Sequence, residues 1–327
     1  MEYYKLNSLY IEVTHSCNQH CRHCYLDGGI HQKIKEMTTE QIKKIFTEFK
    51  EQGGRYVTFT GGEPLMRSDV FELLDFLESL GLHFSFASNS LGMNSERLEK
   101  LASYSGLSLY FTSILGATPE KHKAITGKDS FDSALNAVKF FDEKGIPTFV
   151  QATLANDYLD DAEDILKLFS CFKNCSVKIT PIASLGCKSE SEKSENKSLI
   201  VPQERFEDFH EKLHKLCEKY PDCVGDDNVL SFEQISDIIN ENSKDPLYSL
   251  RWNYVCVRPN GDLSFSYNIN NPFVFGKAYE SVKIPMDEKF FGYIELLKKA
   301  NELVLNDSKE HEIEYDTAVD KYLGVLI

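Results

Sequence analysis

Short apolar runs alternate with amphipathic helical patterns over the first 181 residues of the chain. In the first helical pattern, Thr38 and Gln41 match a capping box, and four apolar side chains recur on one helix face, namely Ile42, Ile45, Phe46 and Phe49. The runs between the helices are rich in β-branched and aromatic residues, as buried strands are. The pattern predicts six strands, over residues 9–13, 56–60, 83–87, 107–112, 148–154 and 177–180. Strands that alternate with helices form a parallel sheet, so we expect an α/β fold.

The pattern changes after Pro181. Residues 187–200 are rich in Ser, Glu and Lys and predict a solvated loop, and residues 203–219 predict a helix. Two strand-like runs around Asn260-Gly261 predict a β-hairpin, and a last helix is expected over residues 287–305. We therefore expect a core over residues 1–186 and a small α+β C-terminal extension over residues 187–327.

Three cysteines follow the first predicted strand at a CxxxCxxC spacing, Cys17, Cys21 and Cys24. A loop that leaves a strand can bring three thiolates to one centre, and three ligands leave one position vacant. Iron–sulfur clusters usually have four thiolate ligands, and structural zinc sites also have four ligands. Two alternatives stay open: ordinary cysteines in a loop, or a zinc knuckle completed by His15, His20 or His23.

A second motif, Gly61-Gly62-Glu63-Pro64, ends the second predicted strand. At the carboxyl edge of a parallel sheet, glycines expose backbone groups and a carboxylate can meet a cation. The alternative is a plain Gly-Gly turn, since glycine is common in turns between strands and helices.

Together the two motifs resemble the signatures CxxxCxΦC and GGEP of the radical S-adenosylmethionine (SAM) superfamily. The resemblance implies a partial (β/α)6 barrel of the TIM type, and the six predicted strand–helix units agree with that count. It further implies one 4Fe–4S cluster held by Cys17, Cys21 and Cys24, whose open iron binds SAM. One-electron reduction would then cleave SAM to methionine and a 5′-deoxyadenosyl radical, which abstracts a hydrogen from the substrate.

The same resemblance implies further contacts with SAM. Gly61, Gly62 and Glu63 would hold the methionine ammonium, and His23, at the Φ position, would lie near the adenine. Ser88-Asn89-Ser90 is similar to the family's Thr-Asn-Gly, with Ser90 in place of the glycine. The remaining candidate contacts come from strand ends, namely Ser88, Asn89, Ser113, Gln151 and Thr153. The alternatives are a turn or cap asparagine and ordinary polar residues at the ends of strands.

The C-terminal extension resembles a SPASM or twitch extension, which binds auxiliary clusters in many relatives. The hairpin around Gly261 matches, but Ser266 stands where a cysteine is usual and no cysteine follows Cys256, so we expect no auxiliary cluster. Cys187 and Cys256 are candidate hydrogen donors, because a thiol has that role in radical SAM peptide epimerases. Packing in the core is the alternative for both. Cys171 and Cys175 with Cys187 would form only an incomplete second site.

Composition narrows the class of substrate. The formal net charge of −15 disfavours nucleic acid, whose phosphates need basic patches, and is compatible with a small molecule or a basic peptide. The nine cysteines are an odd number, the N-terminus lacks the features of a signal peptide, and no apolar run is long enough to span a membrane. We therefore expect a cytoplasmic protein with reduced thiols and no membrane partner.

The extension most resembles that of enzymes that mature ribosomally synthesised peptides, so we expect crosslinking or epimerisation of a peptide. The sequence before Cys17 has no room for a leader-binding domain, and this absence and that of the auxiliary-cluster cysteines both disfavour a peptide substrate. A peptide-modifying enzyme of this kind would use a separate leader-binding protein. An external one-electron reductant of the flavodoxin or ferredoxin type is also implied. The alternatives are an enzyme acting on a sugar, amino acid or other small natural product, and a non-catalytic Fe–S sensor or carrier. Gly61 to Glu63 disfavour the carrier, which needs no SAM site.

Overall fold

A single curved sheet organises the molecule. The computed structural model describes residues 3–24, 26, 34–182, 190–224, 229–230, 255–265, 273–309 and 313–314. Six strands of this part run parallel in sequence order, β2 (Ser8–Glu12), β3 (Tyr56–Thr60), β4 (His83–Ala87), β5 (Leu107–Ser113), β6 (Thr148–Leu154) and β7 (Cys175–Pro181). The predicted α/β class and the six predicted parallel strands are confirmed.

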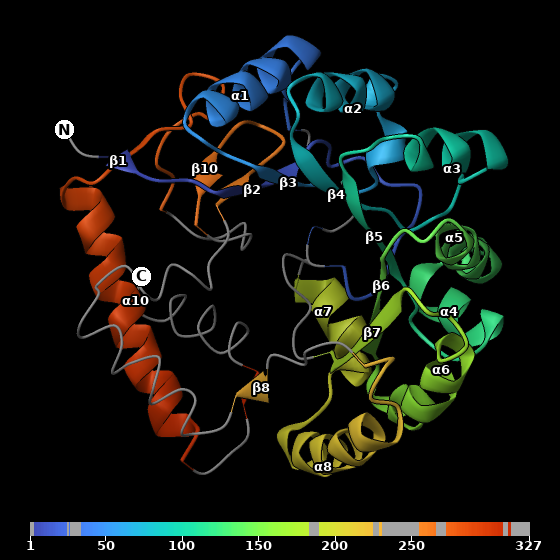
Figure 1. Ribbon diagram of the computed structural model, residues 1–327. Helices are drawn as coiled ribbons and strands as arrows, with labels where there is room; N and C mark the ends of the chain where they lie inside the picture. Colours follow the sequence, from blue (N-terminus) through green and yellow to red (C-terminus); the bar gives the residue numbers. More distant parts are fainter. Residues whose placement is uncertain are drawn as a thin grey trace.

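Helices connect these strands and lie on the outer side of the curved sheet (Figure 1). They are α1 (Thr39–Glu51), α2 (Val70–Ser79), α3 (Ser95–Ala102), α4 (Pro119–Thr126), α5 (Phe131–Glu143) and α6 (Ala162–Phe169), with short 3-10 turns η2 (Pro64–Met66) and η3 (Asn156–Asp161). The predicted capping box at the start of α1 is confirmed, because Thr38 accepts from the Gln41 backbone and Gln41 accepts from the Thr38 backbone. Each strand from β2 to β6 is therefore followed by a helical crossover to the next parallel strand, as a parallel sheet requires.

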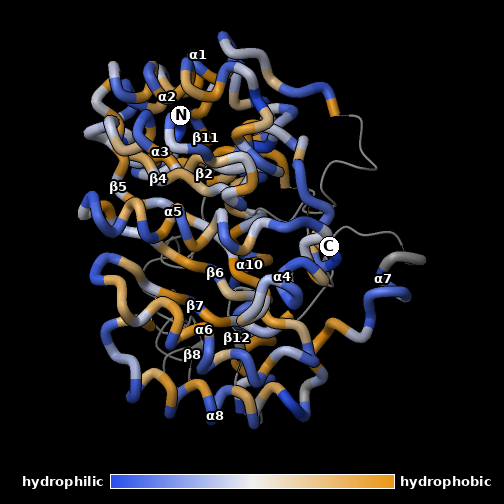
Figure 2. Tube along the Cα trace, turned by 90° about the vertical axis from the view of Figure 1, so that its right-hand side faces the viewer, coloured by the Kyte–Doolittle hydropathy of each residue, from blue (hydrophilic) through white to orange (hydrophobic). Residues whose placement is uncertain are grey.

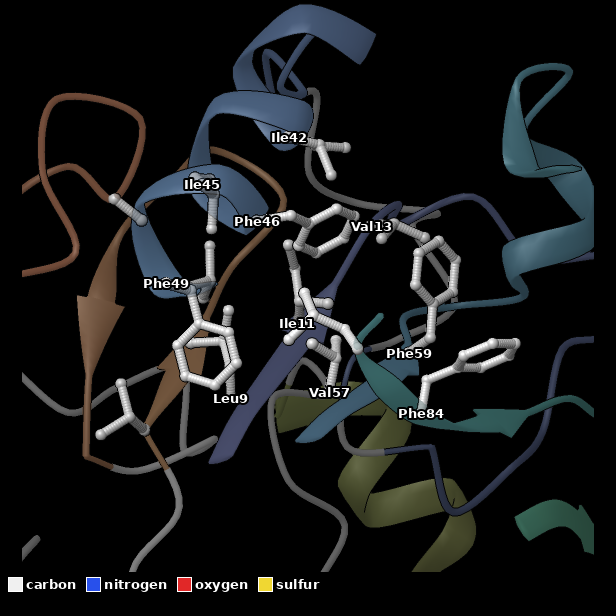
Figure 3. Packing of buried hydrophobic residues seen from close by; sticks show 14 of the residues in the cluster. Leu9, Ile11, Val13, Ile42, Ile45, Phe46, Phe49, Val57, Phe59 and Phe84 are labelled. Atoms are coloured by element: carbon white, nitrogen blue, oxygen red, sulfur yellow. The ribbon is translucent and has the colours of Figure 1, made fainter. Parts of the chain in front are cut away.

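Alternate strand residues form the core between the sheet and the helices. Leu9, Ile11, Val57, Phe59 and Phe84 pack against the apolar face of α1, which Figure 3 shows from close by. Every second strand residue and the α1 residues at i, i+3, i+4 and i+7 thus pack together in one buried layer. The other face of each strand turns toward the inside of the curve, where polar residues such as Ser85 and Thr58 contact each other.

Truncation of this core is expected to be costly. Phe49 is fully buried, and Phe49→Ala should lower the free energy of unfolding by about 3–5 kcal/mol, the usual cost of emptying a buried aromatic site. Phe291, with 45% of its surface exposed, is the control, and Phe291→Ala should change the value by less than about 0.5 kcal/mol. Urea unfolding monitored by circular dichroism measures both. Equal losses in the two variants would contradict this packing.

The C-terminal part completes the same sheet. The predicted hairpin is confirmed as β9 (Cys256–Val257) and β10 (Leu263–Ser264), and β9 runs parallel to β2 at the edge of the sheet. The helix α10 (Glu288–Asp307) contributes Phe290, Tyr293 and Val304 to the cluster that contains Leu9. The core thus continues from the parallel strands into the C-terminal part. The boundary at residue 186 lies outside the described residues and stays a prediction.

The remaining elements lie at the periphery. They are α7 (Glu190–Asn196), η4 (Lys197–Leu199), α8 (Gln203–Lys219) and two short antiparallel pairs, β1 (Tyr3–Tyr4) with β11 (Ile284–Pro285) and β8 (Val229–Leu230) with β12 (Ile313–Glu314). The predicted loop over residues 187–200 is wrong for residues 190–199, which are helical. Glu and Lys are good helix formers, and the buried Leu199 gives this segment an apolar contact. The predicted helix over residues 203–219 is confirmed, and Figure 2 shows hydrophilic and hydrophobic residues alternating along it.

Candidate functional site

The candidate residues gather at the carboxyl edge of the parallel strands. Carboxyl ends of neighbouring parallel strands meet at one edge of a sheet. The cysteine loop (residues 16–24) follows β2, Gly61 to Glu63 follow β3, and Ser88 and Asn89 follow β4. The registers of β2 with β3 and of β3 with β4 place these segments side by side.

One side of the cysteine loop is fixed by Asn89. Its Nδ2 donates to Asn18 Oδ1 at 2.7 Å and to Cys17 Sγ at 3.6 Å, while its Oδ1 accepts from the Leu91 backbone at 2.8 Å. Asn18 Nδ2 in turn donates to the Leu91 carbonyl at 2.7 Å. The Asn89 amide thus joins the end of β4 to the first cysteine. A contact between Asn89 and SAM, expected from the resemblance, stays a prediction. The side chain has a structural role as well, because it holds the cysteine loop against the end of β4.

The other side of the loop is fixed by α4 and α5. His20 N and Arg22 N donate to the carbonyls of Thr126 and Ile125 at 3.2 and 2.9 Å. Gln19, almost fully buried, donates from Nε2 to Ser130 Oγ at 2.7 Å.

Gln19 also connects the loop to a buried histidine. Ser130 Oγ lies 2.8 Å from His122 Nε2, and His122 Nδ1 accepts from the Leu115 backbone at 3.1 Å. Burial lowers the pKa of His122 to about 4, so the ring stays neutral and keeps Nδ1 as an acceptor. The sequence analysis missed Gln19 and Ser130, which are 111 residues apart. No local pattern links them.

The three cysteines lie in one short loop. Cys24 N donates to the Cys21 carbonyl at 3.0 Å, so these two cysteines share one tight turn, and Cys17 interacts electrostatically with Cys24. In the described part of the chain, no three His, Cys, Asp or Glu side chains could hold one metal ion. A 4Fe–4S cluster does not need such convergence, since each thiolate binds a different iron. Ligation of a cluster by Cys17, Cys21 and Cys24 stays a prediction.

The Cys17 thiol is half-buried and lies against two N–H donors. Gln19 N lies 3.4 Å from Cys17 Sγ, and the Asn89 amide is the second donor. Burial raises the pKa of Cys17 to about 11, so without metal the group is a neutral thiol. A bound metal would favour the thiolate, and the two N–H groups would then stabilise its charge.

Gly61 and Gly62 are required by a close approach of two backbones. Gly62 N donates to the Thr14 carbonyl at 2.7 Å, and Glu63 N donates to the Ser16 carbonyl at 2.8 Å. A Cβ on Gly61, whose φ is +148°, would lie 2.5 Å from Thr14 O, and a Cβ on Gly62 would lie 2.5 Å from Ser16 O. The pair is therefore more than a plain turn, because it presses the Glu63 segment against the start of the cysteine loop.

Glu63 is a fully buried carboxylate beside that loop. Its Oε1 accepts from Ser88 Oγ at 2.9 Å and from Leu65 N at 3.2 Å, and its Oε2 accepts from Asn89 N at 2.7 Å. Burial raises the pKa of Glu63 to about 7 despite these donors. The structure thus brings together Glu63, Ser88 and Asn89, three of the residues that the sequence analysis selected.

The raised pKa predicts a pH-dependent stability for the protein purified without metal. Its value of about 7, against an ordinary 4.5, means that Glu63 stabilises the fold below about pH 4.5, and that this contribution is lost as the pH rises through about 7. Between pH 5 and pH 8, the unfolding free energy of the wild type should fall relative to Glu63→Gln by up to about 3 kcal/mol. Urea unfolding of both proteins at the two pH values measures this. Parallel profiles would contradict a buried, titrating Glu63.

Ser90 adopts the left-handed conformation that glycine usually takes, with φ of +63°. Its hydroxyl lies 2.8 Å from Tyr110 OH and 2.7 Å from Thr112 Oγ1, and its N–H donates to Ser88 Oγ at 3.0 Å. These buried contacts hold the strained turn. Ser90, at the position of the glycine in the Thr-Asn-Gly motif that this segment resembles, therefore stabilises the loop that carries Asn89.

The other candidates lie farther along the same edge. Ser113 at the end of β5 lies opposite Gln151 of β6 in the sheet. Gln151 Nε2 donates to Thr180 Oγ1 at 3.0 Å and to Thr153 Oγ1 at 3.5 Å. Ser113, Gln151 and Thr153 are half-buried, as is His23 in the cysteine loop. The expected contacts of Ser113, Gln151, Thr153 and His23 with SAM stay predictions.

Of the two candidate hydrogen donors, Cys256 lies in the described part of the chain. Cys187 lies outside the described residues. Cys256 is fully buried in β9 opposite Tyr10 of β2, and burial raises the pKa of its thiol well above the ordinary value. Its group therefore stays a neutral S–H at physiological pH.

Comparison with known proteins gives a consistent result. Residues 11–169 match the family described as the radical SAM superfamily. The chain is 30% identical over 161 residues to an AdoMet-dependent heme synthase of Oleidesulfovibrio alaskensis (48% of this chain, 40% of the relative). It is 34% identical over 176 residues to the mycofactocin maturase MftC of Mycolicibacterium smegmatis (54% and 44%). The matched part thus spans less than half the length of these relatives.

Solved structures confirm the fold. Streptococcus suis SuiB bound to its precursor peptide SuiA has a TM-score of 0.68 and 17% identity, covering 89% of this chain and 67% of SuiB. Native anSMEcpe with bound AdoMet has a TM-score of 0.66 and 16% identity, covering 97% of this chain and 95% of that one. The expected partial barrel of the TIM type is confirmed. Separately, the described residues include no helix long and apolar enough to cross a membrane.

Proposed function

We propose, from the match of residues 11–169 to the radical SAM superfamily, that the protein is an enzyme that cleaves SAM reductively and modifies a peptide. The observation that supports this most is the contact between the two motifs. The Gly61–Gly62 backbone lies against residues 14–16, directly before Cys17, and Asn89 contacts both Cys17 and Glu63. A group held by the three cysteines would therefore lie next to a buried carboxylate.

The family implies a 4Fe–4S cluster and SAM, and we assign their binding to residues of this edge. Cys17, Cys21 and Cys24 would hold three irons, and Glu63 would face the methionine ammonium of SAM. When bound, the cluster supplies the electron that cleaves SAM to methionine and a 5′-deoxyadenosyl radical, which abstracts a hydrogen from the substrate. The chain itself positions the two motifs through Asn89, Gln19 and the glycine pair, and it keeps Glu63 away from water. A sensor or electron carrier would have no use for this second motif.

A peptide is the substrate that we propose. The names of several relatives support it, namely the mycofactocin maturase, the PqqA peptide cyclases and SuiB with its precursor peptide. The heme synthase, at similar identity, supports a small-molecule substrate as the second candidate. We further propose an external one-electron reductant, a separate leader-binding protein and a hydrogen-donor role for Cys256, whose neutral S–H is the form that can give a hydrogen atom.

Iron and sulfide analysis after anaerobic reconstitution tests the cluster assignment. The wild type should hold one 4Fe–4S cluster per chain, and Cys17→Ala, Cys21→Ala and Cys24→Ala should each lose most of it. Cys171→Ala is the matched control, because Cys171 is exposed and remote from the loop, and it should retain the wild-type content. Equal cluster content in the triad variants and in the control would refute the assignment.

Mass spectrometry distinguishes the substrates. A short peptide encoded beside this protein, incubated with reconstituted enzyme, SAM and reductant, should lose two hydrogens if a crosslink forms. If epimerisation occurs, it should gain one deuterium in D₂O. No change in such peptides, with turnover of a small molecule instead, would favour the second candidate.

A further inference from the structure

A buried polar cluster lies where β2 meets the β9–β10 hairpin. Glu12, the last residue of β2, is fully buried, Arg258 directly after β9 is 8% exposed, and His15 is 4% exposed. Ile11 and Val257, next to Glu12 and Arg258 in sequence, pack into the outer core, so Glu12 and Arg258 belong to the inner face of the curved sheet. Glu12 and Arg258 thus lie on the inside of the curved sheet, and the His15 ring lies 3.9 Å from Glu12.

The His15 imidazole is buried without a hydrogen bond. In the part of the chain that the structure describes, neither Nδ1 nor Nε2 has a hydrogen-bond partner, and Glu12 Oε2 lies 3.9 Å from Nε2, too far for a bond. The backbone is firmly held, because His15 N donates to Glu36 Oε1 at 2.8 Å. Buried polar atoms are normally bonded, and each one left unbonded destabilises the fold. The ring therefore has binding capacity that the protein does not use.

The charges around the ring favour a neutral ligand. Glu12 and Arg258 have opposite charges and offset each other. Glu36, on the segment before α1, lies 3.9 Å from Arg67, which also pairs with Asp69. A neutral imidazole ring offers one N–H donor and one acceptor. An amide has both complementary groups, whereas a carboxylate would face Glu12 and an ammonium would face Arg258.

The position is suited to substrate. His15 lies two residues before Cys17, and its carbonyl would be only 2.6 Å from a Cβ on Gly62, so the residue borders both motifs. Its ring lies toward Glu12 on the β9 side. We propose that His15, flanked by Glu12 and Arg258, binds a neutral amide of the substrate, either a peptide group or a side-chain carboxamide. The assignment of this ligand to the substrate rests on the proposed function.

Two measurements test the site. His15→Phe keeps a ring of similar shape but no ring nitrogen, and since the wild-type ring makes no hydrogen bond, the thermal unfolding temperature should be unchanged or higher. In protein labelled with ¹⁵N-histidine, acetamide should shift the His15 ring signals, which are identified by their absence in His15→Phe and in His15→Gln. Acetate and methylammonium should bind about tenfold more weakly, the factor that one net hydrogen bond of about 1.4 kcal/mol corresponds to.

Two results would overturn the proposal. One is a clear drop in the unfolding temperature of His15→Phe, which would mean that the ring is already bonded within the protein. The other is a His15 signal that acetamide leaves unmoved, or that acetate or methylammonium moves equally. Formation of 5′-deoxyadenosine by the wild type reports separately on the proposed function. If acetamide binds but SAM is not cleaved, the amide site is supported and the proposed enzymatic function is refuted. If SAM is cleaved but acetamide does not bind, only the amide site is refuted.

Discussion

Replacing Gly62 by alanine is expected to abolish assembly of the cluster site. The added Cβ would lie 2.5 Å from Ser16 O and 2.6 Å from His15 O, and both contacts are with backbone that cannot turn away. Relief would require the two motifs to separate, which moves the start of the cysteine loop. Overpacking of this kind costs about 1–3 kcal/mol or more. We expect loss of most of the cluster's visible absorbance after reconstitution, together with a lower unfolding temperature.

Gly292→Ala is the matched control. Gly292 lies within α10, and a Cβ there meets nothing within 4 Å, so alanine should leave the cluster unchanged and add up to about 1 kcal/mol of stability. If Gly62→Ala assembled the cluster as well as Gly292→Ala does, the backbone contact between the motifs would not be required.

Replacing Glu63 by glutamine should weaken SAM binding strongly. The buried carboxylate accepts three hydrogen bonds, and its raised pKa indicates a group that a nearby cation would stabilise. Loss of one partner in a buried charge pair costs about 2–5 kcal/mol, which corresponds to an affinity lower by about 30- to 5000-fold. Calorimetric titration of SAM into the reconstituted proteins measures the effect.

Glu72→Gln controls for the general loss of a negative charge. Glu72 is 57% exposed and pairs with Lys43 at the surface, so its replacement should leave SAM affinity unchanged. If the Glu63→Gln protein is folded, holds its cluster and binds SAM with an affinity within about threefold of wild type, the assignment of Glu63 to the SAM site is wrong.

The parallel core could be predicted because its signals are local. The helix spacing of Ile42 to Phe49 and the capping pair at Thr38 and Gln41 act within a few residues. Once the strands are parallel, the ends of β2, β3 and β4 must lie at one edge, so the approach of Glu63 to the cysteine loop followed from the sequence.

The contacts that fix the loop could not be predicted, because they join distant segments. Gln19 meets Ser130, Asn89 meets Cys17, and the β9 strand joins β2 across more than 200 residues of chain. The charged run over residues 190–196 misled the analysis, since polar composition is common to solvated loops and surface helices. The unbonded ring of His15 is likewise a property of packing, and its sequence position suggested only a zinc ligand.

Formation of 5′-deoxyadenosine tests the central claim most directly. Anaerobically reconstituted wild-type protein, given SAM, dithionite and candidate substrate, should release 5′-deoxyadenosine, and Cys17→Ala under the same conditions should release none. Cleavage in the wild type alone would establish radical SAM chemistry at Cys17, Cys21 and Cys24. A wild type that assembles no cluster, or a Cys17→Ala variant that cleaves SAM equally well, would contradict it.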